Sequence, residues 1–499
     1  MRQRTPVAIL LSPRPAVVAA VRRTGARTVV VAPGPSEPSD REGAVRPARW
    51  TRPAPVPAGR PGAPPLRPYD RAPARRPAGG ALPVPAAAPV PAAGPYGPAA
   101  DRPAAYDLSG APAGARVPPG ASRPAGPADP AGSRARPEDP AGRLDADWRD
   151  HARLVAALAR LRAVREGRAA VFGFGGQAAA LAAARANEAL GLPGATVAAV
   201  TALTDKAALR ARANTLHPGR PVSFVRCGHA LLLPFLAGLI GYPCVVKPRA
   251  GTGGEGVRAL RGPADATAAV HDYPAVTDLL VEELLEGPEI TALTVSRAGR
   301  HRVLGLLHRL PARDGARTAA LGHRAPVPLP PDTAGAVRAH VRAVLDLAGH
   351  RDGPARTELV LTRHGPRLVE ADPHPGGPET AGLLLLAHGA DVYAATAAAA
   401  LDLPEPPGRP RAGHAGLRYV DLPPGHRLDA LPGALASARA TVPGLVAAGP
   451  LVPTSGTVGA TPTGDGHHAY LLAGGATAAS VHRVLERAAA LVASPRGRF

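Results

Sequence analysis

Lysine is almost missing from this 499-residue chain, which has 57 arginines but only Lys206 and Lys247. A GC-rich coding bias would replace lysine by arginine, and it fits the heavy use of alanine, glycine and proline. A compact ammonium reaches a phosphate oxygen as a point charge, whereas a planar guanidinium is bulkier and favours a bidentate partner. The two retained lysines therefore predict a nucleotide triphosphate as ligand, against the alternative that two lysine codons survived by chance.

Cysteines and aromatic residues are also scarce. Aromatic side chains make up 3% of the chain, so a core must consist mainly of alanine, valine and leucine. Two cysteines, Cys227 and Cys244, exclude a disulfide framework and predict a cytoplasmic protein. Pro13 and Arg14 interrupt the first apolar run before a signal sequence could form. The uncharged run 227–246 is broken by prolines and a glycine, so we predict a helix, a turn and a strand there and no membrane span.

Acidic residues are fewer than basic ones, and the formal net charge is +21. Such an excess raises nucleic acid as a partner. The arginines are spread along the chain, however, without a basic helix or a patch interleaved with aromatic residues. We therefore expect no specific nucleic-acid site, although non-specific binding to polyanions stays open.

The N-terminal region predicts the start of a doubly wound α/β domain. Apolar strands at 7–11 and 28–31 flank a short helix at 16–23. From 34 to 143 the chain becomes rich in proline, alanine, glycine and arginine, and apolar periodicity ends. We interpret 34–143 as a disordered insertion.

Regular structure is predicted again from about residue 144. Residues 148–166 have a helical pattern, 169–173 a strand pattern, and Gln177–Leu190 a second helical pattern. The turn between the last two, 173–176, holds three glycines. Such a turn can bind an anion at the helix N-terminus, but close packing of strand and helix is the favoured interpretation.

A strand and a glycine-rich loop form the strongest motif. The apolar strand ends at Lys247 and is followed by a loop with Gly251, Thr252, Gly253 and Gly254. Glycines let backbone N–H groups close over phosphate oxygens without obstruction by Cβ. The lysine precedes the loop, so this is neither a Walker A loop nor a dinucleotide fingerprint.

Two further motifs follow. Residues 279–290 predict a strand, a short acidic hinge and a second strand, and such a hinge can bind an adenine edge and ribose hydroxyls. Residues 356–372 predict a β-hairpin that places Glu358 opposite Glu370, with Asp372 on the same side. Three carboxylates on one sheet face repel one another unless a cation lies between them, and Mg²⁺ bound by carboxylates and phosphates resolves this conflict.

Together these motifs resemble the ATP-grasp superfamily, and within it the carboxylate–amine ligases of the L-amino-acid-ligase type. The segment Gly322-His323-Arg324-Ala325-Pro326 is similar to a Gly-His-x-x-Pro segment of such ligases. The resemblance implies a pre-ATP-grasp α/β domain (1–33 and 144–201), an ATP-grasp domain (202–403) and a small C-terminal α+β domain (404–499). It also implies small-molecule amino-acid and amine substrates, and a homodimer as one open alternative.

The resemblance also implies site residues and cofactors. Lys206 and Lys247 would contact ATP phosphates, beneath the loop that contains Gly251, Thr252, Gly253 and Gly254. The remaining implied roles are adenine binding by Glu282, Glu283 and Leu285, ribose binding by Glu289, and binding of Mg²⁺ or Mn²⁺ by Glu358, Glu370 and Asp372. The implied reaction activates a carboxylate as an acyl phosphate with release of ADP, and an amine then attacks.

The chain departs from the family pattern at two positions. Asp372 stands where asparagine is usual, and His374 stands where an arginine usually helps to bind the substrate. We hypothesise that Arg356, on the facing strand, supplies the missing positive charge. Arg309 is a further departure from the family pattern, because many relatives have a lysine at this position near a strand end.

Several functions stay open after the sequence alone. The first is an ADP-forming ligase that makes a dipeptide or amide in specialised metabolism. The second is another ATP-grasp ligase or carboxylase, for example in purine metabolism. The third is a degenerate ATP-binding protein without turnover.

Overall fold

The computed structural model describes residues 5–32, 142–251, 254, 256–311, 320–459 and 467–494, which belong to one compact unit. The predicted insertion, apart from its last two residues, lies outside the described part. Thr252 and Gly253 lie outside it as well.

The N-terminal sheet is parallel and has the order β3-β2-β1-β4. Its strands are β1 (Val7–Leu11), β2 (Arg27–Ala32), β3 (Arg143–Asp145) and β4 (Ala169–Phe172). Strand β3 begins at Arg143, which is the last residue of the predicted insertion. Beside the sheet lie α1 (Pro15–Arg22), α2 (His151–Leu158), α3 (Arg162–Arg165) and α4 (Gln177–Leu190). The predicted helix at 148–166 was wrong in detail, because the chain turns at 159–161 and forms two helices.

Both faces of this sheet are buried, as a doubly wound fold requires. Val7, Ile9 and Leu11 pack with α2 and α4 on one face. Ala8 and Leu10 face the other way, toward α1 and α11 (Val392–Leu401). Helix α11 therefore covers the N-terminal sheet although it comes from the predicted ATP-grasp region.

A four-stranded antiparallel sheet carries the glycine loop and has the order β5-β8-β6-β7. Its strands are β5 (Phe224–His229), β6 (Cys244–Pro248), β7 (Arg258–Leu260) and β8 (Val276–Glu283). They pack with η1 (Ala230–Leu232), α7 (Leu233–Ile240), α8 (Pro263–Ala269) and η2 (Val270–Asp272). The uncharged run 227–246 thus begins in a strand and continues as helix, turn and strand.

The largest sheet has eight strands in the order β13-β12-β9-β10-β11-β14-β16-β15. Its first five strands by sequence are β9 (Glu289–Arg297), β10 (Arg300–Pro311), β11 (Ala320–Ala325), β12 (Gly353–Thr362) and β13 (Gly365–Asp372). The last three are β14 (His414–Val420), β15 (Leu445–Pro450) and β16 (Ala469–Gly475). Because β14 pairs with β11, the C-terminal strands extend the same sheet.

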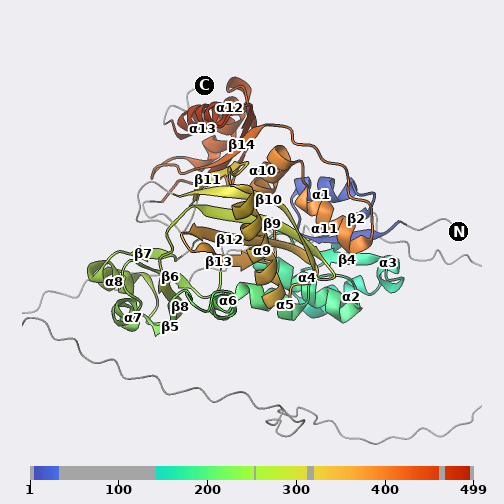
Figure 1. The fold of residues 1–499 in the computed structure, drawn as a ribbon. Coiled ribbons are helices and arrows are strands. Elements are labelled where there is room, and N and C mark those ends of the chain that lie inside the picture. The colour runs from blue at the N-terminus through green and yellow to red at the C-terminus, as the bar shows by residue number, and fades with distance from the viewer. Residues whose placement is uncertain are drawn as a thin grey trace, which may run out of the picture. The chain divides into compact units, whose positions relative to one another are not determined.

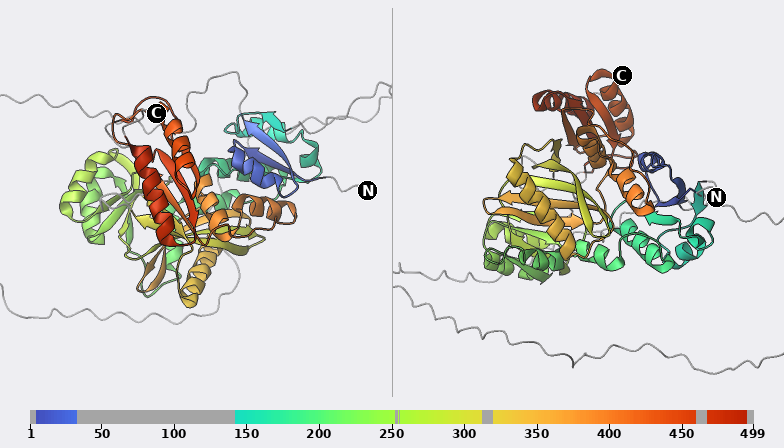
Figure 2. Two further views of the ribbon diagram at one scale, coloured as in Figure 1. Left: turned by 90° about the horizontal axis from the view of Figure 1, so that it is seen from above. Right: turned by 45° about the vertical axis from the view of Figure 1, so that its right-hand side comes forward.

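Helices cover both faces of the large sheet (Figures 1 and 2). Helix α9 (Pro331–Leu347) packs its apolar side on β9 and β13, beside α5 (Val197–Thr204) and α6 (Lys206–Asn214). The opposite face carries α10 (Pro378–His388). The C-terminal strands are covered by η3 (Leu428–Ala430), α12 (Leu431–Thr441) and α13 (Ala478–Ala493).

Within the described residues, no single helix is long and apolar enough to cross a membrane. Helices α10 and α11 reach that length and hydropathy only as a pair, which is bent by 91°.

Candidate nucleotide and metal site

The hairpin of β12 and β13 brings the predicted carboxylates together. Glu358 lies opposite Glu370, and Arg356 lies opposite Asp372. The two strands are joined by a tight turn in which Gly365 has a φ of +92°, a conformation that favours glycine. The predicted β-hairpin of two strands around this turn is therefore confirmed.

Arg356 lies among all three carboxylates. Its guanidinium is 3.3 Å from Glu358 Oε1, 3.3 Å from Glu370 Oε1 and 2.5 Å from Asp372 Oδ2. The side chains of this cluster are at most 16% exposed, so water screens the charges little. The cation that the three carboxylates require is thus supplied in part by the protein itself.

The cluster still holds an excess of negative charge. Burial would raise the pKa of Glu358, but the Arg356 and Arg309 guanidiniums hold it below its usual range. Burial, together with the neighbouring Glu358 and Asp372, raises the pKa of Glu370 to about 7 despite Lys206 and Arg356. A further cation beside Glu370 would therefore relieve an existing repulsion.

Both lysines of the chain converge on consecutive residues of β13. Lys247 Nζ donates to the Val369 carbonyl at 3.2 Å. Lys206 Nζ lies 3.5 Å from Glu370 Oε2 and donates to the Gly251 carbonyl at the start of the glycine loop. Lysines from α6 and β6 thus meet beside the carboxylate cluster, although 41 positions separate them in the sequence.

Lys247 is held by a buried charge network. Its ammonium pairs with Glu282, whose other oxygen accepts from Arg210 Nε at 2.9 Å. The side chains of all three residues are at most 5% exposed. Burial lowers the pKa of Lys247, while Arg210 and Lys247 together hold the pKa of Glu282 down against burial. Sequence reasoning missed Arg210, because one arginine among 57 carries no signal until its partner is known.

The Asp205-Lys206 pair is fixed by a second network. Asp205 caps α6 by accepting from Ala208 N at 3.1 Å, and it accepts from Arg249 Nε at 2.9 Å. The bond from Arg249 lowers the pKa of Asp205 to about 2. Arg249 also donates to Asp278 on β8 at 3.0 Å. The first residue of the loop after β6 is therefore tied to both α6 and β8.

The acidic hinge between β8 and β9 spans residues 284–288, as the sequence predicted. Glu283 Oε2 accepts from Ser223 N at 3.2 Å, so this side chain is occupied by the neighbouring strand region. Glu289 pairs with Arg309, its cross-strand partner on β10. Leu285 is half-buried in the hinge itself.

The two histidines near the cluster are buried and neutral. His374 accepts from Gly376 N at its Nδ1 (3.1 Å), so its Nε2 carries the proton in the neutral ring. That Nε2 lies 3.9 Å from Asp372 Oδ1. Burial lowers the pKa of His374 to about 4 and that of His323 to about 3. Position 374, where the resemblance predicts an arginine, thus holds an uncharged ring, with the Arg356 guanidinium on the facing strand.

In the glycine turn 173–176, Gly173 packs closely against the backbone of α4. A Cβ at Gly173 would overlap the carbonyl of Ala179 in α4, so strand and helix approach too closely for another residue. Gln177 Nε2, at the first position of α4, donates to Asp372 Oδ1 at 2.7 Å. The N-terminal sheet thereby reaches the carboxylate cluster through a side chain that sequence reasoning had not singled out.

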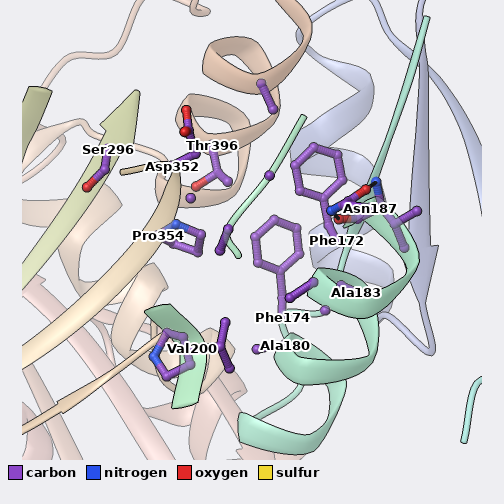
Figure 3. Close-up of a pocket in the computed structure, with 18 of the residues that line it drawn as sticks. Phe172, Phe174, Ala180, Ala183, Asn187, Val200, Ser296, Asp352, Pro354 and Thr396 are labelled. Carbon is purple, nitrogen blue, oxygen red and sulfur yellow. Dashed lines mark hydrogen bonds between the residues drawn. The ribbon is translucent and has the colours of Figure 1, made fainter. Parts of the chain in front are cut away.

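A small cavity lies behind this turn (Figure 3). Its wall includes Phe172 and Phe174, whose stacked rings are 5.5 Å apart, and Pro354 and Thr396 on the other side. The cavity volume is about 40 Å³, against several hundred for a small-molecule site. It can hold a few water molecules at most, and it is not the substrate site.

The carboxylate cluster fits a magnesium ion that is also held by phosphates. Among the described residues, no three carboxylate, imidazole or thiolate side chains are arranged to hold a metal ion by themselves. Mg²⁺ usually takes only one or two carboxylates from the protein and completes its octahedron with phosphates and water. Each carboxylate already contacts a protein donor: Asp372 contacts Gln177 and Arg356, Glu370 contacts Arg356 and Lys206, and Glu358 contacts Arg356.

Comparisons with known proteins bear on the domain family and on the fold. Residues 236–378 match the family model described as an ATP-grasp domain. A comparison of the sequence with curated proteins gave no match.

Three solved structures are similar in fold. L-amino acid ligase from Bacillus licheniformis has a TM-score of 0.62 at 16% identity, covering 98% of each chain. Phosphoribosylglycinamide synthetase from Anaerococcus prevotii has a TM-score of 0.53 at 10% identity, covering 97% of this chain and 98% of its own. The biotin carboxylase domain dimer of Hydrogenobacter thermophilus 2-oxoglutarate carboxylase, solved with MgADP, ADP and bicarbonate, has a TM-score of 0.51 at 14% identity, covering 95% and 87%. The family match thus identifies an ATP-grasp domain at residues 236–378, and the chain as a whole is similar in fold to these three proteins.

Proposed function

We propose that the protein is an ATP- and Mg²⁺-dependent ligase that joins the carboxylate of an amino acid to an amine. The observation that carries this proposal is the convergence of both lysines on residues 369 and 370 of β13, beside the Glu358–Glu370 pair. Two ammonium groups next to two metal-binding carboxylates match the charge pattern of a magnesium-bound triphosphate. The full-length similarity in fold to an L-amino acid ligase supports the choice of substrates.

The residues divide the work as follows. Lys206 and Lys247 would neutralise phosphate oxygens, with the loop that includes Gly251, Thr252, Gly253 and Gly254 above them. Glu282, Glu283 and Leu285 would border the adenine, and Glu289 the ribose. Glu282 would also hold Lys247 in place through their ion pair.

Glu358 and Glu370 would hold Mg²⁺, which polarises the transferred phosphoryl group when bound. Asp372 would join them as the third metal ligand and would also orient Arg356 through their hydrogen bond. Arg356 and His374 would face the substrate carboxylate during its conversion to an acyl phosphate. The attack of an amine on that acyl phosphate would release inorganic phosphate and leave the amide.

The test is a screen for ADP release with pairs of amino acids, with detection of the product by mass. We expect ADP release that requires an amino acid and Mg²⁺, and a product whose mass equals both reactants minus water. Arg356→Ala should abolish acyl-phosphate formation, which trapping with hydroxylamine would measure. Unchanged hydroxamate formation in this variant would show that Arg356 does not bind the substrate carboxylate.

A second candidate is an ATP-binding protein without turnover. It is favoured by one observation, namely that Arg356 already occupies the centre of the carboxylate cluster. This candidate predicts that ATP binds while no amino-acid pair or bicarbonate increases ADP release. Bicarbonate-dependent ADP release would indicate a carboxylase of the ATP-grasp type instead.

A further inference from the structure

Glu379 is a buried carboxylate that the proposed chemistry leaves unused. It lies in the first turn of α10, directly after the Gly376-Gly377 segment that follows β13. The side chain is 8% exposed, and its Oε2 has no hydrogen-bond partner among the described residues. An unsatisfied buried carboxylate oxygen is costly, so a retained one points to a ligand that completes it.

The Glu379 carboxylate folds back against the backbone just before α10. A Cβ at Gly377 would overlap this carboxylate, so another residue there would make the end of the Glu379 side chain move. A Cβ at Gly376 would lie 3.4 Å from Arg356 Cδ and 3.7 Å from Thr380 Oγ1. These are ordinary contact distances, so they show that the start of α10 lies beside the Arg356 side chain, while the φ of +83° at Gly376 favours glycine there.

Two donors of the neighbouring carboxylate cluster are also without partners in the described part of the chain. They are Arg356 Nε and His374 Nε2, both on buried side chains. An amino acid at neutral pH has two carboxylate oxygens that accept and an ammonium group that donates. Two unpaired N–H groups and one unpaired carboxylate oxygen are the complement of that molecule.

Three tyrosines interact electrostatically with Glu379 in a chain that has few aromatic residues. Burial raises the pKa values of Tyr393, Tyr419 and Tyr470, and the negative charge of Glu379 raises each of them further. The cations that act on Glu379 are Arg14 and Arg356. Aromatic rings near a carboxylate favour a bound ammonium group, because the ring faces attract cations.

We propose that Glu379 binds the α-ammonium group of the amino acid whose carboxylate is activated, and so makes the enzyme selective for amino acids over simple carboxylic acids. The assignment rests on the proposed function and names a specificity residue of the same site. The acceptor is Glu379 Oε2, while Arg356 and His374 face the carboxylate of the same molecule.

The first experiment uses the wild-type protein with ATP and Mg²⁺. Each of the twenty amino acids is tested for ADP release and, separately, for a shift of the Tm. The most active amino acid is then compared with its desamino acid, which lacks only the ammonium group. We expect kcat/KM to fall roughly 10- to 100-fold for the desamino acid, as for loss of a hydrogen bond to a charged group. Equal use of the two compounds would overturn the assignment, without any need for a variant.

The second experiment compares Glu379→Gln with a control, Glu405→Gln, which changes an exposed glutamate paired with Arg302. We expect Glu379→Gln to raise KM for the amino acid roughly 10- to 100-fold, leave kcat/KM for the desamino acid unchanged, and keep ATP affinity. The control should behave as wild type. A fall in kcat with unchanged KM would show that Glu379 acts on the attacking amine instead, and would overturn the assignment.

Thermal shifts separate this assignment from the proposed reaction. If no amino acid increases ADP release but one raises the Tm of wild type and not of Glu379→Gln, the ligase proposal fails and the ammonium site stands. If none of the twenty amino acids raises the Tm or increases ADP release, the ammonium site fails as well.

Discussion

The scarcity of lysine made single residues unusually informative. Both lysines lie beside β13, and each is fixed by a partner that the sequence did not reveal, Glu282 for Lys247 and Glu370 for Lys206. Arginine would be expected at such positions in this chain if any cation sufficed. The retained ammonium groups therefore indicate a requirement for a small point charge.

Lys247→Arg tests this requirement. The side chain of Lys247 is only 5% exposed between Glu282 and the Val369 carbonyl, so a guanidinium must displace packed neighbours. Overpacking of this kind costs about 1–3 kcal/mol of folding stability, and the displaced cation should weaken ATP binding roughly 10-fold, as for a lost hydrogen bond to a charged group. Isothermal titration with ATP and Mg²⁺ measures the effect. The reverse change at a half-exposed cation, Arg249→Lys, should weaken binding less, and unchanged ATP affinity in Lys247→Arg would mean that the lysines survived by chance.

At the scale of elements, glycine decides how closely strand and helix pack. Gly173 at the end of β4 lies against the backbone of α4, whereas Gly175, two residues later, has open space where its Cβ would be. The sequence showed a glycine-rich turn but could not tell an anion-binding turn from a packing contact. The distinction depends on the distance between two elements, which is a property of the tertiary structure.

Gly173→Ala should destabilise the protein by about 1–3 kcal/mol, because the new methyl group overlaps the carbonyl of Ala179. Gly175→Ala is the matched control and should leave the free energy of unfolding within about 0.5 kcal/mol of wild type. Urea unfolding followed by circular dichroism measures both variants. Equal stability of the two variants would show that α4 can move away from β4 at little cost.

Buried histidines at α9 make the stability of the fold depend on pH. Burial lowers the pKa values of His340, within α9, and His350, just after it, to about 4. In the unfolded chain both titrate near 6.5, so the unfolded state binds more protons between pH 6.5 and 4. The stability from these neutral rings is present above pH 6.5 and is lost as the pH falls toward 4.

We therefore expect the free energy of unfolding to fall between pH 6.5 and 4 by about 2 kcal/mol for each of these histidines. Urea denaturation at a series of pH values gives the slope. His340→Gln should reduce the slope, because glutamine does not titrate, while His482→Gln on the exposed side of α13 should not. A slope that His340→Gln leaves unchanged would contradict the assignment.

At the scale of the whole molecule, segments far apart in the sequence pack together in the sheets and at the carboxylate cluster. Helix α11 covers the N-terminal sheet, Gln177 reaches Asp372, and β14 continues the sheet that begins with β13. The domain limits predicted from the sequence stay a proposal, because strands on both sides of residue 404 share one sheet. Strand β3, which begins at Arg143, nevertheless pairs directly with β2.

Deletion of residues 39–134 should leave Tm and ATP affinity essentially unchanged. Strand β3 pairs with Val30–Ala32 at the end of β2. The connection from Ala32 to Arg143 therefore has to span only the length of about three strand residues and the gap to the neighbouring strand. Residues 33–38 and 135–142 remain after the deletion and can span roughly 45 Å when extended. Differential scanning calorimetry and ATP titration check the result. A Tm lowered by more than about 5 °C would show that the deleted segment contributes to the folded unit.

The sequence by itself determined the local elements and the chemical motifs: the first parallel strands, the glycine loop, the acidic hinge, the β12–β13 hairpin and the ATP-grasp resemblance. These depend on patterns within a few residues, such as period-two alternation and glycine turns. Only the tertiary structure decided which charges meet. It placed Arg356 among three carboxylates and Arg210 behind Glu282, and it buried Glu379 with one oxygen that has no partner among the described residues. Such contacts join elements far apart in the chain, and burial, which no local pattern encodes, determines how strongly they act.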